Sequence, residues 1–306
     1  MKSDDFVCQK DFKSNAIIKK TIRYHFALCY NDIGDNMAEF IEILKYIILG
    51  IIQGITEIFP ISSSGHLTLF SHFFKMDMTE FSTFLMITNT GSFLALLYYF
   101  KRDVGQLIKG TFCYLVRKDE TGKEDFVYVL KLVIAVIPVG IVGLLLKDTL
   151  PNDLLSVGFA LLITSGLLYY VYQQKDIQWK REITWKNALV IGAFQMFAIF
   201  PGISRSGITV SGGLTQKIEL KKVLRFSFLS YVLISIPVSM LGLYEALNAS
   251  EPIHYLGYSF AFLMSFIFSL IAVKFLYEYV KVKNLIYFSV YCLMVGLFSI
   301  ILYFLQ

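Results

Sequence analysis

The feature that most constrains this chain is the recurrence of apolar segments of about 20 residues, which continues to its C-terminal end. Each segment could cross a hydrocarbon core of roughly 30 Å as a helix. A helix of a soluble bundle needs a polar face, and segments 84–100 and 285–305 have none. Only 17% of the residues are charged, against about a quarter in a soluble domain. The sequence therefore predicts an all-α polytopic membrane protein.

Six apolar segments are long enough to span the membrane, and four others form two broken pairs. In each pair a turn rich in Pro, Gly and Ser interrupts the apolar run: 40–59 is paired with 63–74, and 188–200 with 204–216. The six long segments are 83–100, 126–146, 154–173, 223–246, 255–276 and 285–305. The sequence thus predicts six spanning helices and two helical hairpins.

The charges of the connecting links predict the orientation of the chain. Lysines and arginines number six, four, four and three in the links 101–125, 174–187, 217–225 and 274–284, whereas the links 75–82, 147–153 and 247–254 carry one, one and none. We therefore expect the first set in the cytoplasm. The alternation works only if 188–216 enters and leaves on the cytoplasmic side and 40–74 on the outer side. Each pair is then a re-entrant hairpin, and the two hairpins are opposed.

The net charge of +5 does not indicate a nucleic-acid partner, because the basic residues fall in short links and form no patch. This pattern is typical of topology signals and of contacts with anionic lipids, so membrane lipids are expected as partners. Residues 1–36 are polar and lack a long apolar run. We expect them to be an extension outside the fold, or alternatively a functional tail, ahead of one transmembrane domain over 37–306.

The two broken pairs contain similar sequences. Residues 53–65 read QGITEIFPISSSG and residues 195–207 read QMFAIFPGISRSG, so both place Gly twelve residues after Gln with Pro between them. Non-helical backbone at membrane depth is tolerated only when protein buries it or when it lines a wet cavity. A repeat with opposed topology therefore predicts an inverted duplication whose two turns meet in one polar site.

Glu57 lies inside the apolar stretch of the first pair. A carboxylate there costs at least about 2.5–3.5 kcal/mol on insertion scales, so it should be paired or coordinated. Gln53 is four residues earlier, on the same helix face. The two side chains could hold a divalent cation or orient a water; alternatively, Arg205 neutralises Glu57 as a purely structural partner.

The run Ser62-Ser63-Ser64-Gly65 supplies hydroxyls and backbone amides at a helix start, where anions bind. A helix N-cap alone would need only one hydroxyl. His66 follows within the same turn and could act as nucleophile or general acid, or it could simply hydrogen-bond a neighbouring helix.

Arg205 is the only arginine expected at membrane depth, and Ser204, Ser206 and Gly207 flank it. An arginine fork with hydroxyls and helix amides suits a phosphate group. A carboxylate for a metal, hydroxyls, a histidine and an arginine together form the set that phosphoryl transfer needs. The membrane depth implies a phosphate carried on a lipid.

The sequence QGITEIFPISSSGH resembles the first signature of the undecaprenyl-pyrophosphate phosphatases of the bacitracin-resistance type, and PGISRSG resembles the second. The resemblance covers 37–306 and includes FSFL at 226–229. It implies hydrolysis of undecaprenyl pyrophosphate to the monophosphate with a divalent cation, Mg²⁺ or Ca²⁺. It further implies recycling of the lipid carrier of cell-wall synthesis, bacitracin resistance, and a multi-pass protein of the bacterial plasma membrane.

The resemblance also implies roles for individual residues. Glu57 and Gln53 would handle the metal or a water, and Arg205 would clamp the phosphate; Ser63 and His66 are alternative nucleophiles. In that family the first position of the acidic motif is Glu or Gln, so Gln53 leaves Glu57 as the only carboxylate of the pair. The expected substrate-binding residues are Gln53, Ser62, Ser64, Gly65, Ser204, Ser206 and Gly207.

Two other functions agree with parts of the sequence. Inverted repeats and broken helices also build secondary transporters, so a transporter or flippase of a polyprenyl phosphate is the alternative. Ser64-Gly65-His66 superficially matches an unrelated type of lipid phosphatase, whose arginine-containing pieces are not found here in the required arrangement. The charge rule favours a site that opens to the outer face, and a homodimer is left open.

Overall fold

The computed structural model describes residues 37, 39–74, 78–146, 149–175, 182–247 and 254–305. The chain divides into two units, Met1–Lys45 and Tyr46–Gln306, and the second contains both turns of the predicted site. The predicted extension, 1–36, lies outside the described residues. The single domain over 37–306 stays a prediction.

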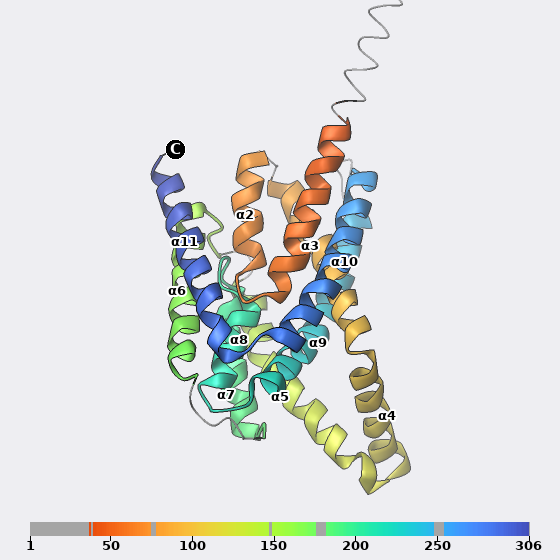
Figure 1. The fold of residues 1–306 in the computed structure, drawn as a ribbon. Coiled ribbons are helices and arrows are strands. Elements are labelled where there is room, and N and C mark those ends of the chain that lie inside the picture. Colours follow the sequence, from red (N-terminus) through yellow and green to blue (C-terminus); the bar gives the residue numbers. More distant parts are fainter. Residues whose placement is uncertain are drawn as a thin grey trace, which may run out of the picture. The chain divides into compact units, whose positions relative to one another are not determined.

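Every regular element of the described residues is a helix, as the composition predicted. One helix covers 39–58. The others are α2 (Ser63–Phe74), α3 (Met78–Tyr99), α4 (Lys101–Arg117), α5 (Lys123–Leu146), α6 (Leu154–Gln173), α7 (Trp185–Met196), α8 (Arg205–Leu214), α9 (Leu220–Leu247), α10 (Tyr255–Tyr279) and α11 (Leu285–Phe304), with short 3-10 turns η1 (Glu120–Gly122), η2 (Phe197–Ile199) and η3 (Val282–Asn284) (Figure 1).

Within the described residues, five helices are long and apolar enough to cross a membrane. A sixth span results if α3 and α4, which meet at an angle of 73°, count as one. These helices correspond to the six long apolar segments of the sequence. The all-α polytopic membrane fold is therefore confirmed, whereas the re-entrant path of the hairpins stays a prediction.

The prediction of 101–125 as a connecting link is wrong, because most of it forms α4 and η1. Its high density of charge suggested a loop, yet α4 is amphipathic: Leu107 is buried, while Arg102 and Lys109 are exposed. An ion pair of 2.6 Å between Asp103 and Arg225 fixes the start of α4 to α9. The charged helix α4, which this ion pair joins to α9, thus follows directly after the apolar helix α3.

The two helix breaks lie where the sequence predicted them. Between the helix that ends at residue 58 and α2, Ser62 has a φ of 70°; between α7 and α8, Gly202 has a φ of 93°. Backbone with positive φ is costly for residues other than glycine, so Ser62 carries strain at this turn. Pro60 and Pro201 precede these positions and lack the amide that a continuous helix would need.

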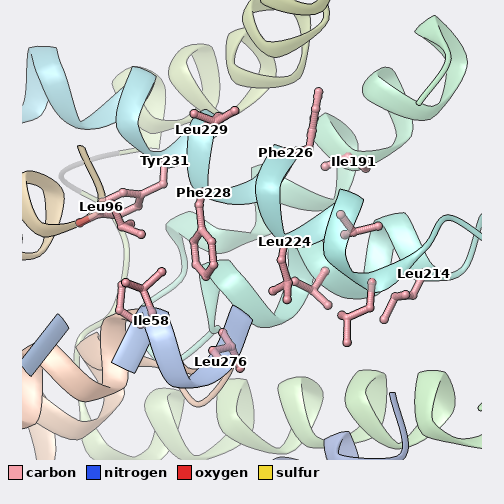
Figure 2. Packing of buried hydrophobic residues seen from close by; sticks show 14 of the residues in the cluster. Ile58, Leu96, Ile191, Leu214, Leu224, Phe226, Phe228, Leu229, Tyr231 and Leu276 are labelled. Atoms are coloured by element: carbon pink, nitrogen blue, oxygen red, sulfur yellow. The ribbon is translucent and has the colours of Figure 1, made fainter. Parts of the chain in front are cut away.

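The largest buried cluster surrounds α9 and ties both hairpins to the same core. Phe226, Phe228 and Leu229 of α9 are fully buried or nearly so. Figure 2 shows them with residues from five other helices: Ile58, Leu96 of α3, Ile191 of α7, Leu214 of α8 and Leu276 of α10. Packing against one shared helix therefore sets the positions of the two turns.

The helix that carries Glu57 packs directly on the backbone of α10. A Cβ on Gly54 would lie 2.6 Å from the carbonyl oxygen of Ser265, and Ser269 Oγ donates to the carbonyl oxygen of Gly54 at 2.9 Å. Small residues that let backbones approach, with hydroxyls as polar contacts, are typical of helix packing in membranes. This contact fixes the height of Glu57 along α10.

We predict that Gly54→Ala destabilises the fold by about 1–3 kcal/mol, because the added Cβ would meet a backbone carbonyl that cannot move away cheaply. Gly166→Ala in α6 is the matched control. Among the described residues, no atom of another helix lies within 4 Å of its Cβ position, so this change should be neutral or stabilise by up to about 1 kcal/mol. Thermal unfolding in detergent measures both variants; an equal response of the two would contradict the close contact.

Candidate active site

The two turns contact each other directly. Ser206 Oγ donates to the carbonyl oxygen of Phe59 at 3.0 Å, and the backbone amide of Gly202 donates to Ser64 Oγ at 3.1 Å. Each turn thus supplies one hydroxyl to a backbone group of the other. Figure 1 shows α2 on one side of this meeting point and α7 on the other. The two polar segments converge, as their similarity predicted.

Both turns use the same helix cap. Ser62 Oγ accepts from the amide of Gly65 at 3.2 Å, and Ser204 Oγ accepts from the amide of Gly207 at 3.1 Å. One serine of each turn therefore has the capping role that needs only one hydroxyl. The two glycine amides, which were expected to bind an anion, are engaged by these caps.

A cavity of about 230 Å³ lies at the contact of the turns. Of the residues predicted for the site, those that line it are Glu57, Ser62, Ser63, Ser64, Ser204 and Arg205. Those outside its lining are Gln53, Gly65, His66, Ser206 and Gly207. Residues of both turns therefore border one space, and each of the remaining predicted residues forms a hydrogen bond with a residue of the lining.

Glu57 makes three polar contacts at this cavity, and its side chain is only 6% exposed. Its Oε2 accepts from Ser63 Oγ at 2.5 Å and from Gln53 Nε2 at 2.9 Å. Its Oε1 lies 3.6 Å from Nη1 of Arg205. The carboxylate is thus paired, as membrane depth requires. Because the hydroxyl of Ser63 also donates to this carboxylate, Glu57 can accept a proton in a reaction as well as pair with Arg205.

Arg205 lies over the ring of Tyr231, with its guanidinium carbon 4.8 Å from the ring centre. Tyr231 in turn donates to the carbonyl oxygen of Asn89 at 3.3 Å. Stacking on an aromatic face orients a guanidinium and leaves its donors in the plane available for an anion. Sequence reasoning missed Tyr231, because nothing distinguishes this tyrosine from the others in apolar segments.

Asn89 of α3 is a second residue that sequence reasoning missed. Its Oδ1 accepts from Gln53 Nε2 at 2.5 Å, and its side chain borders the cavity. A signal for it existed, since an amide in the middle of the apolar segment 83–100 needs a partner at membrane depth.

His66 is 3% exposed and does not line the cavity. Its Nδ1 lies 2.7 Å from the carbonyl oxygen of Ser62, which can only accept, so Nδ1 carries the proton. In the neutral ring, Nε2 then accepts from the hydroxyl of Tyr291 on α11 at 2.7 Å. Of the two alternatives for His66, the structure therefore shows the hydrogen bond to a neighbouring helix. A catalytic role of His66 stays a prediction.

The repeat extends beyond the two turns. Gln53 and Gln195 are 142 residues apart, and the same offset separates Met78 and Leu220, the first residues of α3 and α9. Residues of the site that this offset relates are Ser62 and Ser204, Ser63 and Arg205, and Asn89 and Tyr231. Equivalent positions of the two halves thus carry different chemical groups.

Comparisons with known proteins agree in one family. The family model described as bacitracin resistance protein BacA matches residues 46–298. The undecaprenyl-diphosphatase of Acholeplasma laidlawii is 57% identical over 275 residues, which cover 87% of this chain and 99% of that protein. Undecaprenyl-diphosphatase 2 of Bacillus thuringiensis is 38% identical over 273 residues, which cover 87% and 99%.

We predict that Ser63→Cys reacts readily with a small water-soluble thiol reagent, whereas His66→Cys resists it. Ser63 lines the cavity and His66 is buried outside it. The test uses a background in which Cys8, Cys29, Cys113 and Cys292 are replaced by alanine, and mass spectrometry follows the labelling rate. Comparable rates at both positions would contradict this placement of the two side chains.

Proposed function

The chain belongs to the BacA family of bacitracin resistance proteins, and on that premise we propose that it is an undecaprenyl-diphosphatase. It hydrolyses undecaprenyl diphosphate to undecaprenyl phosphate and inorganic phosphate. The reaction recycles the lipid carrier of peptidoglycan synthesis, and it confers bacitracin resistance because bacitracin sequesters the diphosphate. The observation that carries the proposal is a hydroxyl, a carboxylate and a guanidinium in contact within one cavity.

Ser63 is the nucleophile in this proposal. Its hydroxyl donates to Glu57 at 2.5 Å, so the carboxylate can take the proton while the oxygen attacks the terminal phosphorus. A bond from phosphorus to the serine oxygen forms, the bond to the bridging oxygen breaks, and undecaprenyl phosphate leaves. Water then attacks the phosphoserine, and the serine oxygen regains the proton held by Glu57. The released phosphate keeps the hydroxyl of the water, whose second proton passes to solvent.

Arg205 stabilises the charge on the phosphates. Its contact with Glu57 is loose at 3.6 Å, so the planar fork can turn toward an incoming anion and donate two parallel bonds. The hydroxyls that border the cavity and could bind the remaining phosphate oxygens are those of Ser62, Ser64 and Ser204. Gly65, Ser206 and Gly207 support these hydroxyls through the caps and the bonds between the turns.

His66 has a supporting role in this proposal. Both of its ring nitrogens are engaged, one by the carbonyl of Ser62 and one by Tyr291. It therefore fixes the first turn to α11 and holds the strained residue next to the nucleophile.

A divalent cation, Mg²⁺ or Ca²⁺, is the proposed cofactor. The donor set fits such an ion: Glu57 and Asn89 line the cavity, and Gln53, which hydrogen-bonds both, has a buried Oε1 without a hydrogen-bond partner among the described residues. Mg²⁺ is commonly held by one or two carboxylates together with substrate phosphates. When bound, the cation would neutralise phosphate charge, so one carboxylate can suffice with Gln53 as a neutral ligand.

The protein is a multi-pass membrane protein, and the plasma membrane of a bacterium is its proposed location. The distribution of lysines and arginines supports a site that opens to the outer face. Cross-linking in that membrane would test the homodimer, which stays a prediction.

The decisive measurement is phosphate release from undecaprenyl diphosphate by the purified protein in detergent. We expect release with Mg²⁺ or Ca²⁺ and its loss in EDTA and in Ser63→Ala. Acid quenching of a single turnover should trap phosphoserine, whereas phosphohistidine would assign the nucleophile to His66 instead. A transporter or flippase would bind the lipid and release no phosphate, so absence of release under any divalent ion would overturn the proposal.

We predict that Arg205→Lys lowers kcat by a factor of about 10²–10³ while the fold is retained, because lysine keeps the charge but loses the fork and the stacking. Arg225→Lys is the control, since Arg225 pairs with Asp103 away from the cavity. It should keep near wild-type turnover. Near wild-type turnover of Arg205→Lys itself would mean that this arginine is only a structural partner of Glu57.

A further inference from the structure

A second, smaller cavity lies behind the pair of Glu57 and Arg205. It measures about 10 Å³, which is room for the centre of one water molecule. The polar residues of its lining that matter here are Glu57, Gln195, Arg205, Thr209, Ser227 and Tyr231. No step of the proposed reaction uses this space.

Gln195 of α7 is the residue of this cavity that calls for an explanation. Its side chain is buried, with the residue only 1% exposed. Neither its Oε1 nor its Nε2 has a hydrogen-bond partner among the described residues. Buried amides are almost always satisfied by protein or by ordered water, because an unpaired amide in an apolar interior is costly.

The first half of the repeat shows how the NH2 group of the equivalent amide is satisfied there. Gln53 donates from Nε2 to Glu57 at 2.9 Å and to Asn89 at 2.5 Å. In the second half the residues at the equivalent positions are Ile199 and Tyr231. An isoleucine offers no acceptor, and the hydroxyl of Tyr231 donates to the carbonyl of Asn89. The direct partners of the first half are thus missing around Gln195, and the small cavity stands in their place.

We propose that this cavity binds one water molecule, which hydrogen-bonds the amide of Gln195 and connects it to Arg205. A water both donates and accepts, so it can serve either polar atom of the amide. The hydroxyls of Thr209 and Ser227, which bond to each other at 2.5 Å, retain lone pairs that can complete its shell. The site thus meets the requirement of two to four polar partners for a buried water.

Gln195 is, on this proposal, a positioning residue for Arg205. Arg205 borders both cavities, so a water held by Gln195 restrains the guanidinium from behind while its fork faces the larger cavity. The ring of Tyr231 restrains it from a second direction. The positioning role of Gln195 rests on the function proposed for Arg205. The presence of the bound water does not depend on that function.

Gln195→Met tests the bound water, because methionine has nearly the same length and removes both polar atoms. If a water satisfies the amide, the variant loses its hydrogen bonds, and we expect Tm in detergent to fall by about 2–6 °C. If the amide has no ligand, an apolar side chain should leave Tm unchanged or raise it. That result would overturn the proposal.

Ser230→Ala is the matched control for this comparison. Ser230 of α9 is fully buried, has no partner for its hydroxyl among the described residues, and does not line the cavity. We expect its Tm and kcat to remain those of the wild type. An equal loss of Tm in Ser230→Ala would mean that any buried polar atom responds in this way, and the proposal would fall.

Kinetics of Gln195→Met test the positioning of Arg205. We expect kcat to fall roughly tenfold with KM unchanged, because a misplaced guanidinium mainly weakens contacts made in the transition state. A lower Tm with wild-type kcat would overturn the link to Arg205. If the wild-type protein released no phosphate, the function proposed for Arg205 would fail, while the Tm comparison would still decide the bound water.

Discussion

Two interruptions of helical backbone within an apolar chain leave carbonyl and amide groups that a hydrocarbon environment cannot satisfy. In this protein each turn supplies a hydrogen-bond partner to the backbone of the other: Ser206 donates to the carbonyl of Phe59, and Ser64 accepts from the amide of Gly202. These bonds exist only when both turns are in place. The hairpins therefore depend on each other for their stability, and the cavity with Glu57 exists only at their contact.

The frame of the site is symmetric, but its chemistry is not. Both halves share the serine cap and the same spacing from glutamine to glycine. The differences lie at a few equivalent positions: Glu57 against Ile199, Ser63 against Arg205, and Asn89 against Tyr231. The first half thus supplies the carboxylate and the hydroxyl. The second half supplies the guanidinium of Arg205, which lies over the ring of Tyr231. A duplicated scaffold that has diverged at these positions gives one polar site from two similar pieces.

Much of this arrangement could be predicted from the sequence, because helix-breaking and polar residues stand out in an apolar run. Pro60, Pro201 and Glu57 are such residues. The helices are interrupted at the two prolines, and Glu57 forms an ion pair with Arg205. Tyr231 could not be predicted, since its contact with Arg205 depends on how α9 packs and not on any local pattern. The surroundings of His66 were hidden for the same reason, because its partner on α11 lies 225 residues along the chain.

The glycine contacts of the hairpins have a consequence for motion. Gly54 is pressed against α10, and a Cβ on Gly192 of α7 would lie 2.8 Å from the carbonyl oxygen of Ala135 on α5. Neither hairpin can slide along its neighbour or rotate without bringing a side chain onto backbone. An incoming headgroup therefore meets a backbone that is already in place, and the cost of reorganisation on binding falls on side chains such as Arg205. Hairpins clamped in this way suit a fixed reaction chamber better than a passage that opens alternately to the two faces of a membrane.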